Sequence, residues 1–481
     1  MKVKAFIFSV FFAAIMLLSA CGDGSDGRII LEFDGGGGSG DYNSTISMVQ
    51  SSANPYPYNT LEKLAEEWNK SNDKFKVVIN KNSLRGMRSA VTSLLEAGNA
   101  PDMLFQVGSV INDDIANGWY VPLDTYLQKP NPYMQGNTQW ADIYDSRELA
   151  TTRASDGSHY YVCLDRVALG LLYNIEILNQ AGIQDIPVTF SEFIECLETL
   201  KQAKANGTIQ AEVFAHQGLW TELHLNASVY AGKIAEWDLD GDRMVSSYEL
   251  AKAYKEGGWS YNDGEFEEFL RLCYEKGKYY PDNYLAYDVS YNFSRGRLAV
   301  TDGLGNNMRI AQSGLKDKLV VGGYPALDSA ASEYASASVM RGSAGLSTAY
   351  WVTNSAKNKG QDAVDACVDF LMFLSAPQNN SRMVGDLGFA MPLNMQDNNV
   401  SLFDNLASQY LEDLNAGNSV MWGAVDTYSS FGLELSDYYQ RAMGGFYQGP
   451  NEGDPSYIVA VMNNNIDSAL NKLIANNNWD I

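Results

Sequence analysis

Histidine and cysteine are both scarce in this chain, which has three histidines and five cysteines among its 481 residues. The cysteines form no Cys-x-x-Cys pair and no cluster with the spacing of a zinc site. No Gly-x-Ser-x-Gly, His-Glu-x-x-His or Walker A motif is present. We therefore expect no enzyme. One enzymatic alternative stays open, because the paired carboxylates of a glycosidase cannot be identified among 58 acidic residues without geometry.

Positive charge is also in short supply. The chain has 34 Lys and Arg residues against 58 Asp and Glu, which gives a formal net charge of −24 at pH 7. A field of that sign repels nucleic acid and anionic lipid, so we expect neither as a partner. It suits a body that binds neutral or cationic ligands, or metal cations.

Long apolar runs are absent apart from one at the start of the chain. The run from Ala5 to Leu18 follows Lys2 and Lys4 and is too short to favour a membrane-spanning helix. It ends in Leu-Ser-Ala-Cys, which resembles the bacterial lipobox. The resemblance implies that residues 1–20 are a lipoprotein signal peptide and that Cys21 is acylated. We therefore expect a protein held by a lipid anchor on the extracytoplasmic face of the cell membrane; the alternative is an ordinary signal peptide that contains a cysteine.

The segment after the signal has the composition of a linker. Residues 21–43 are rich in Gly, Ser and Asp, which is typical of a flexible tether. The remainder, roughly 440 residues, is more than one hydrophobic core normally covers, which predicts two lobes. No internal repeat of fixed period is present, which argues against solenoids and propellers.

Strand and helix patterns alternate along the chain. Residues 45–50 and 75–79 are expected strands, and a helix beginning near Asn59 separates them. A second helix should stop at Gly98, ahead of a strand at 103–107. Further strands are expected at 167–173, 298–301 and 319–322, a capping box at Thr189 and Glu192, and a helix that ends before Pro377. This alternation predicts an α/β fold with a parallel sheet.

Four cysteines remain after Cys21. They are Cys163, Cys196, Cys273 and Cys367. Two disulfides would be possible in an oxidising compartment, but Cys196 and Cys367 fall on apolar helical faces, which favours buried free thiols.

The order of segments resembles the family 1 extracellular solute-binding proteins, the group that includes maltose-binding protein. The matching pieces occur in the same order over roughly 330 residues, more than a single domain usually contains. They are NTLEKLAEEWNK (59–70), GNAPDMLF (98–105), ANGWYVPLDTYL (116–127), ALGLLYNIEILNQAGI (168–183), VTFSEFIECLETLK (188–201), GGYPALD (322–328), DAVDACVDFLMFLSAPQN (362–379) and LGFAMPLN (387–394).

This resemblance implies an α/β, two-lobed fold of the type II periplasmic-binding-protein kind, with a ligand cleft between hinge-linked lobes. By position, lobe 1 would hold 44–164 plus 317–374, and lobe 2 would hold 165–316 plus 375–481. The implied protein is a monomeric receptor that delivers a solute, carbohydrate and in particular oligosaccharide, to the membrane subunits of an ABC import permease. The alternative is a surface glycan-capture lipoprotein that is not coupled to such a permease.

The abundance of aromatic residues favours a carbohydrate ligand. Tyr, Trp and Phe make up 12% of the chain, and aromatic rings stack on the apolar faces of sugars while polar side chains bind the hydroxyls. Gly305 stands in a turn where sugar-binding relatives often have Trp, which weakens that assignment. The ligand-binding residues that the resemblance implies, with two tryptophans added as candidates, are Gln50, Tyr56, Tyr58, Gln106, Ser109, Asp165, Arg166, Asp302, Asn306, Trp351 and Trp422.

The most specific local motif is DLDGDRMVSSYE at residues 238–249. It follows the pattern of a twelve-residue calcium loop, in which oxygen ligands alternate along the chain and a glutamate at the last position closes the shell. Arg243 stands at the sixth position, where glycine normally allows the sharp turn. The alternative is an acidic surface loop that caps a helix. We expect a structural calcium site with the ligands Asp238, Asp240, Asp242, Met244 (by its carbonyl), Ser246 and Glu249.

Overall fold

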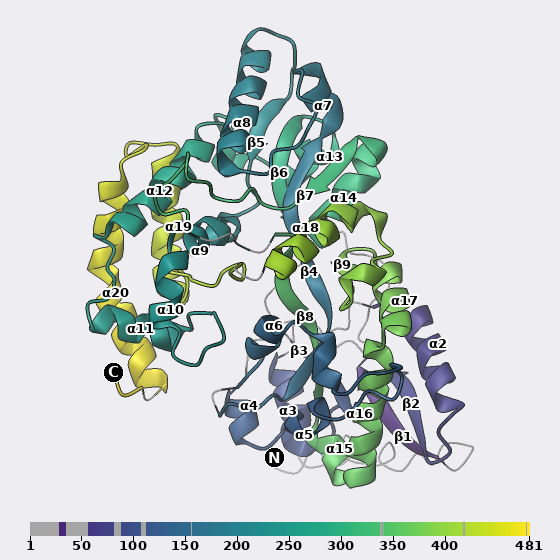
Figure 1. The fold of residues 1–481 in the computed structure, drawn as a ribbon. Coiled ribbons are helices and arrows are strands. Elements are labelled where there is room, and N and C mark those ends of the chain that lie inside the picture. Colours follow the sequence, from purple (N-terminus) through teal and green to yellow (C-terminus); the bar gives the residue numbers. More distant parts are fainter. Residues whose placement is uncertain are drawn as a thin grey trace, which may run out of the picture. The chain divides into compact units, whose positions relative to one another are not determined.

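The computed structural model describes residues 28–34, 56–80, 88–106, 112–154, 156–336, 339, 341–416, 419–477 and 479–481. The chain divides into two compact units (Figure 1). Unit 1 takes the described residues up to Ile143, together with Thr152–Leu164 and Ser347–Leu387, and unit 2 takes Tyr144–Thr151, Asp165–Leu346 and Gly388–Ile481. Two strands, β4 (Tyr161–Asn174) and β8 (Ser343–Val352), run from one unit into the other.

Unit 1 is built on a mixed sheet with the strand order β2-β1-β3-β8. Strand β1 (Ile29–Asp34) is parallel to β2 (Phe75–Asn80) and to β3 (Met103–Gln106), whereas β8 runs antiparallel to β3. Phe33 and Tyr350, from β1 and β8, stack with ring centroids 4.4 Å apart in its core. Its helices are α2 (Tyr58–Asn69), α3 (Arg88–Ala97), α4 (Asn112–Ala116), α5 (Asp124–Leu127), η1 (Trp140–Ile143), α15 (Asn354–Asn358), α16 (Gln361–Ser375) and α17 (Pro377–Leu387).

Unit 2 is built around the second half of β4. Strand β6 (Leu298–Leu304) is antiparallel to β4 and parallel to β5 (Glu212–Ala215), and β7 (Leu319–Gly322) and β9 (Ala390–Met391) also pair with β4. The helices are α6 (Ser146–Ala150), α7 (Ile175–Gln180), α8 (Phe190–Ala205), η2 (Leu219–Glu222), α9 (Leu223–Val229), η3 (Ala231–Lys233), α10 (Ile234–Trp237), α11 (Ser247–Lys255), α12 (Gly264–Gly277), η4 (Tyr284–Ala286), α13 (Val289–Ser294), α14 (Gly305–Leu315), η5 (Lys316–Lys318), η6 (Met395–Asp397), η7 (Ser401–Phe403), α18 (Asp404–Ala416), α19 (Leu433–Tyr447) and α20 (Pro455–Asn477).

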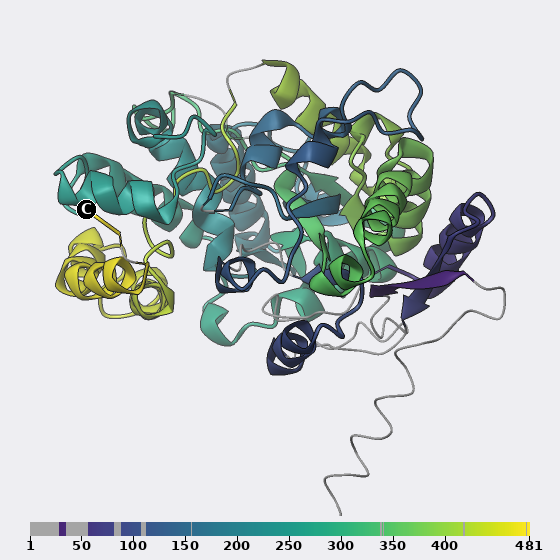
Figure 2. The same ribbon diagram turned by 90° about the horizontal axis from the view of Figure 1, so that it is seen from below.

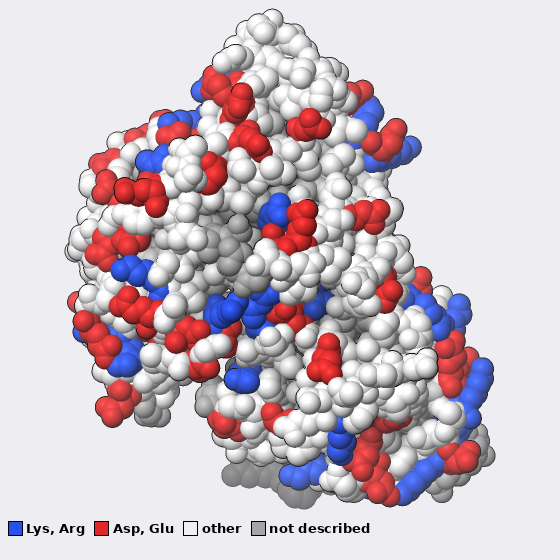
Figure 3. Space-filling model, viewed as in Figure 1, with Lys and Arg blue, Asp and Glu red and all other residues white. Residues whose placement is uncertain are grey.

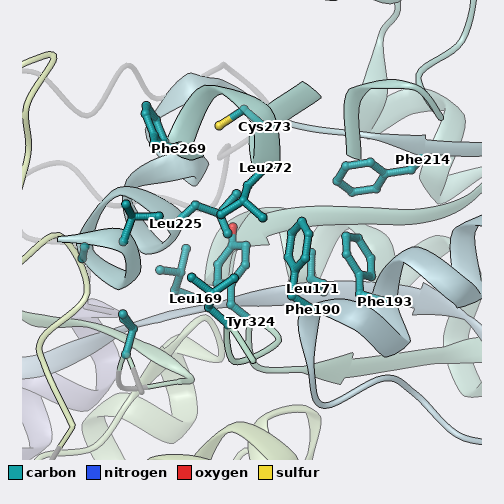
Figure 4. Close-up of a cluster of buried hydrophobic side chains, with 14 of the residues drawn as sticks. Leu169, Leu171, Phe190, Phe193, Phe214, Leu225, Phe269, Leu272, Cys273 and Tyr324 are labelled. Atoms are coloured by element: carbon teal, nitrogen blue, oxygen red, sulfur yellow. The ribbon is translucent and has the colours of Figure 1, made fainter. Parts of the chain in front are cut away.

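A continuous apolar core holds these elements together. Figure 4 shows aromatic and aliphatic side chains from β4, β5, α8 and α12 that point toward one another. Phe193 of α8 meets Phe214 of β5 edge to face, with ring centroids 5.5 Å apart. The long helices α19 and α20 lie side by side against this body, as both Figure 1 and Figure 2 show. Burial of such faces, at about 25 cal/mol per Å², is the main source of stability.

Most of the predicted elements are present. The two-lobed α/β architecture is confirmed, although the sheets are mixed and not purely parallel. Thr189 and Glu192 form the expected capping box at the start of α8, and Gly98 ends α3 with a φ of 66°. Cys163, Cys196, Cys273 and Cys367 are all buried, as predicted. Among the described residues, no helix combines the length and apolarity needed to cross a membrane.

The N-terminal part differs from the prediction. Residues 29–34, inside the predicted tether 21–43, form β1, whose Leu31 and Phe33 are fully buried. The Gly-rich sequence that follows it gives the whole segment the composition of a linker, so the pattern does not reveal this short strand. The strand expected at 45–50 lies outside the described residues.

The borders of the units also differ from the predicted lobes, except at 164/165. Residues 317–346 belong to unit 2, because β7 pairs with β4 from Leu171 to Asn174. Residues 375–387 belong to unit 1, where Arg382 of α17 pairs with Glu67 of α2 at 2.9 Å.

Candidate functional site

The carboxyl ends of β5 and β6 lie at one edge of unit 2. The two strands are parallel, with Phe214 beside Val300 and Ala215 beside Thr301, so the segments that follow them leave the sheet at the same edge. In open α/β sheets, ligands bind beyond the carboxyl ends of the strands. We therefore take the loop after β5 (residues 216–222) and the start of α14 as the candidate site of this unit.

Polar side chains form a short hydrogen-bonded chain at this edge. The Ser290 hydroxyl donates to Oε1 of Gln217 at 3.2 Å, and Nδ2 of Asn307 donates to the Ser290 hydroxyl at 3.3 Å. All three side chains are partly exposed. Amide and hydroxyl groups held in this way can donate to and accept from the hydroxyl groups of a ligand.

An aromatic pair links this loop to a second one. Trp220, in η2, meets Trp422, in the loop between α18 and α19, at a centroid distance of 6.2 Å and an interplanar angle of 63°. Both rings are partly exposed. Tyr428 fixes the loop, because its hydroxyl donates to the Leu219 carbonyl at 3.0 Å. Both rings pack against the core of the unit, and the part that stays exposed is an apolar surface that a ligand could contact.

A buried ionic cluster, formed by Glu222, Lys276, Tyr439 and Tyr447, anchors the end of the loop. The Glu222 carboxylate lies 3.7 Å from the Lys276 ammonium and accepts hydrogen bonds from the hydroxyls of Tyr447 and Tyr439, the latter at 3.2 Å. Glu222 is fully buried and Lys276 is 3% exposed. Because a buried charge is tolerated only with such partners, the cluster pins η2 to α12 and α19.

Asp302 fixes the beginning of the loop. Its Oδ1 accepts a hydrogen bond from the Gln217 backbone N–H at 2.7 Å, and the residue is fully buried. Burial raises the pKa of Asp302 to about 6, although the Lys276 ammonium acts in the opposite direction. Burial also lowers the pKa of His216 well below its usual value, so that ring is neutral. Asp302, predicted as a ligand-binding residue, is better assigned to positioning Gln217.

Arg166, which is predicted to bind the ligand, is buried and hydrogen-bonded within unit 2. Its Nε donates to Glu148 at 2.7 Å, and Nη1 donates to the carbonyls of Pro392, at 3.1 Å, and Leu393. The guanidinium lies over the Tyr410 ring at 5.3 Å, and the residue is 2% exposed. Its hydrogen-bonding capacity is thus used within unit 2, where it ties β4 to α6 and to the segment after β9.

Three further predicted ligand-binding residues are buried. Trp351 is fully buried in unit 1 between Tyr120 and Tyr161, whose ring centroids lie 4.3 and 4.6 Å away. Tyr56 is fully buried as well, and Asp165 is 1% exposed beside Arg166. In this structure these three side chains are therefore buried within their units, and Trp351 shows that an aromatic residue on a central strand can pack inward.

The other predicted residues have mixed placements. Gln106 ends β3 in unit 1, and its Nε2 has no hydrogen-bond partner among the described residues. Asn306 is partly exposed at the start of α14. Gln50 and Ser109 lie outside the described residues, and of Tyr58 only the backbone, at the start of α2, is described.

Gly305 is required by the fold. A Cβ atom at this position would lie 1.8 Å from the Phe389 carbonyl oxygen, so no larger residue fits there without moving the backbone. The tryptophan that the family resemblance places in this turn would therefore not fit here. In this chain Trp220 and Trp422 supply aromatic faces on the same unit.

The acidic loop 238–249 brings three carboxylates together. Oxygen atoms of Asp238, Asp240 and Asp242 lie within 4.8 Å of one another. Glu249 accepts hydrogen bonds from the backbone N–H groups of Leu239, at 2.5 Å, and Ser246, at 2.8 Å. Its side chain thus closes the loop from the first turn of α11. These carboxylates are the groups that could hold a hard cation.

The turn that the motif requires is present despite Arg243. This residue has a φ of 65°, the left-handed conformation that glycine normally supplies at the sixth position. Its backbone N–H donates to Asp238 at 2.8 Å. Burial, with added repulsion from Asp240 and Asp238, raises the pKa of Asp242 to about 6.

The family model for bacterial extracellular solute-binding proteins matches residues 63–396, well over half of the chain. The chain belongs to this family. A probable secreted solute-binding lipoprotein from Streptomyces coelicolor has a similar structure, with a TM-score of 0.61, 15% identity, and coverage of 92% of this chain and 98% of that one. For the sugar-binding protein MalE from Xanthomonas citri the values are 0.61, 15%, 88% and 97%.

The GacH receptor of Streptomyces glaucescens, whose structures include an acarbose complex, gives a TM-score of 0.56, 15% identity, and coverage of 92% of this chain and 99% of that one. At these identities the likeness concerns the fold. No curated protein matches the chain significantly.

Sequence reasoning missed several candidate residues of this extracellular solute-binding protein. Trp220 and Gln217 follow β5, a four-residue strand whose EVFA sequence is too short to stand out by periodicity. Ser290 and Asn307 come from elements more than 70 residues away along the chain from Gln217. Only the pairing of β5 with β6 brings these segments together.

Proposed function

We propose that the protein is a lipid-anchored, monomeric receptor that binds an oligosaccharide outside the cell and delivers it to an ABC import permease. The observation that carries the carbohydrate assignment is the partly exposed Trp220–Trp422 pair, whose Trp220 lies on the same loop as Gln217 of the Gln217–Ser290–Asn307 hydrogen-bonded chain. Aromatic faces beside amide and hydroxyl groups match the amphipathic surface of a sugar. The ligands named for two of the similar structures, sugar and acarbose, support the same class.

The receptor role follows from the family, whose members bind solutes and are not enzymes. The alternative is a glycan-capture lipoprotein that is not coupled to a permease, so the two proposals differ only in this coupling. Co-purification from native membranes separates the two possibilities. We expect the receptor to bring down two membrane permease subunits when the sugar is present, whereas an uncoupled protein would bring down none.

Removing the aromatic pair should weaken sugar binding. We expect Trp220→Ala and Trp422→Ala each to raise the Kd for an oligosaccharide, identified by a thermal-shift panel, about tenfold, which is about 1.4 kcal/mol. Calorimetric titration measures the change. Tyr457→Ala, which removes an exposed ring (37% exposed) from α20, is the matched control and should leave Kd unchanged. If all three variants bind the oligosaccharide with the Kd of the unaltered protein, the aromatic pair is not part of the binding site.

Lipidation is predicted at Cys21, which lies outside the described residues. Mass spectrometry of the protein extracted from membranes should detect a diacylglyceryl group on this thiol and an acyl chain on the new N-terminus. We expect Cys21→Ala to release the protein from the membrane or to leave it unprocessed. An unmodified Cys21 in the mature protein would contradict the anchor.

We also propose that loop 238–249 binds a structural calcium ion. The support is the convergence of three carboxylates on a turn with the left-handed residue that the motif needs. Such a site would stabilise unit 2 between α10 and α11 and would take no part in binding the sugar. Asp238, Asp240, Asp242, Ser246 and Glu249 would hold the ion, together with the Met244 carbonyl.

A further inference from the structure

A pocket of about 330 Å³ lies in unit 2, away from the loops after β5 and β6. One wall is a face of α12 that carries Gly264, Glu267, Glu268, Arg271 and Tyr274, which are spaced three or four residues apart. The opposite face of the helix is buried in the core and carries Phe266, together with Phe269 and Cys273, which Figure 4 shows. The pocket and the buried ionic cluster therefore use different faces of α12.

Two tyrosines shape the pocket, and each is seated on a glycine. A Cβ atom at Gly264 would lie 2.4 Å from the Tyr334 hydroxyl, and one at Gly453 would lie 2.8 Å from the Tyr274 ring. The Tyr274 hydroxyl is further held by Glu452 at 3.1 Å. These rings can take their places only because both glycines lack side chains, so the aromatic lining is fixed by the sequence.

The charge in the pocket is negative, and its one cation is already neutralised. Arg271 donates to both carboxylate oxygens of Glu268 at 2.7 Å and to the Ala331 carbonyl at 2.6 Å. Glu267 and Glu333 are exposed and form no ion pair among the described residues. An anion would meet two uncompensated carboxylates here. A neutral ligand would leave both of them unpaired.

We propose that this pocket binds an organic ammonium group. Glu267 and Glu333 supply the counter-charge, and the ring of Tyr334 supplies an aromatic surface of the kind on which ammonium groups bind. The Tyr274 ring already has the Lys278 ammonium 5.4 Å from its centroid. The excess of acidic groups in the chain, visible on the face in Figure 3, attracts such a ligand. Arg271 lines the pocket, but its guanidinium is paired with Glu268 and is therefore not available to bind an anion.

The test is a titration of the full sugar-free protein with 1,5-diaminopentane and with tetramethylammonium, followed by ligand-observed NMR. An ionic strength of about 0.01 M keeps the Debye length near 30 Å, so that the exposed carboxylates are not screened. We expect saturable binding with a Kd of about 1 mM or tighter. Pentane-1,5-diol, a neutral probe of the same shape as the diamine, should not bind.

Glu267→Gln/Glu333→Gln should weaken binding of the ammonium probes about tenfold. The matched control is Glu66→Gln/Glu96→Gln, which removes the same charge from exposed positions in unit 1 and should change Kd little. Tyr334→Ala should also weaken binding, because it removes one aromatic wall.

N-acetyl-lysinamide serves as a third probe and identifies the source of the ammonium group. If it alone binds, the pocket takes a lysine side chain of a protein partner, and if the diamine binds, it takes a free amine; either outcome supports the ammonium site. Two results would overturn the proposal: no saturable binding of any of the three probes, or equal loss of affinity in both double variants. Neither result would bear on sugar binding, because the aromatic pair lies elsewhere.

Discussion

Replacing Lys276 by Met is expected to lower the free energy of unfolding by about 3–5 kcal/mol, the usual cost of removing one partner from a buried ion pair. The Glu222 carboxylate would then be fully buried without its cation, with the hydroxyls of Tyr439 and Tyr447 still donating to it. Because η2 carries Trp220 two residues before Glu222, we expect sugar affinity to fall in the same variant. Urea unfolding at pH 7, followed by fluorescence, measures the loss of stability.

Lys278→Met is the matched control. This lysine is two residues further along the chain and pairs with Glu275 at 2.6 Å, but its side chain is 40% exposed, so its loss should cost less than about 1 kcal/mol. The double variant Glu222→Gln/Lys276→Met should recover much of the stability, since neither charge of the Glu222–Lys276 pair is then left buried without its partner. Equal destabilisation by the two single lysine variants would contradict the role that we assign to the ionic cluster.

Removal of calcium is expected to produce the second large effect. At a free calcium concentration of about 100 times Kd, a single site stabilises the native state by about 2.7 kcal/mol, which corresponds to about 5–10 °C in Tm for a unit of this size. A chelator should abolish that increment and added calcium should restore it. Differential scanning calorimetry with and without the chelator measures the change.

Asp240→Asn should remove the response to calcium while the fold stays intact, because a neutral amide occupies the same volume. Asp282→Asn, at an exposed acidic position of unit 2 outside the loop, should respond to calcium as the unaltered protein does. If calorimetry detects no binding at millimolar calcium, Arg243 has disabled the site. The loop then serves only to cap α11.

Local signals predicted the elements of this fold well. The capping box at Thr189, the stop at Gly98 and the turn of loop 238–249 depend on residues close together in the chain, so their sequence pattern is sufficient. The short strand β7 was placed at its observed limits for the same reason. The family resemblance supplied the two-lobed arrangement, which no local pattern contains.

Side-chain roles that depend on distant partners could not be read from the sequence. Arg166 was expected to meet the ligand, but Glu148 and the carbonyls of residues 392 and 393 surround it. Trp351 is the type of residue on which a sugar ring stacks, but the rings of Tyr120 and Tyr161 pack against it. The role of Gly305 follows from a carbonyl 84 residues away, at Phe389, and no single-sequence pattern encodes that approach.

Isothermal titration calorimetry of the purified protein with neutral oligosaccharides tests the central claim most directly. The proposed receptor should bind at least one of them with one-to-one stoichiometry, and Trp220→Ala should weaken that binding about tenfold. Amino acids and short peptides, titrated under the same conditions, should produce no saturable heat. One-to-one binding of an amino acid or peptide, with no heat from any oligosaccharide, would contradict the carbohydrate assignment.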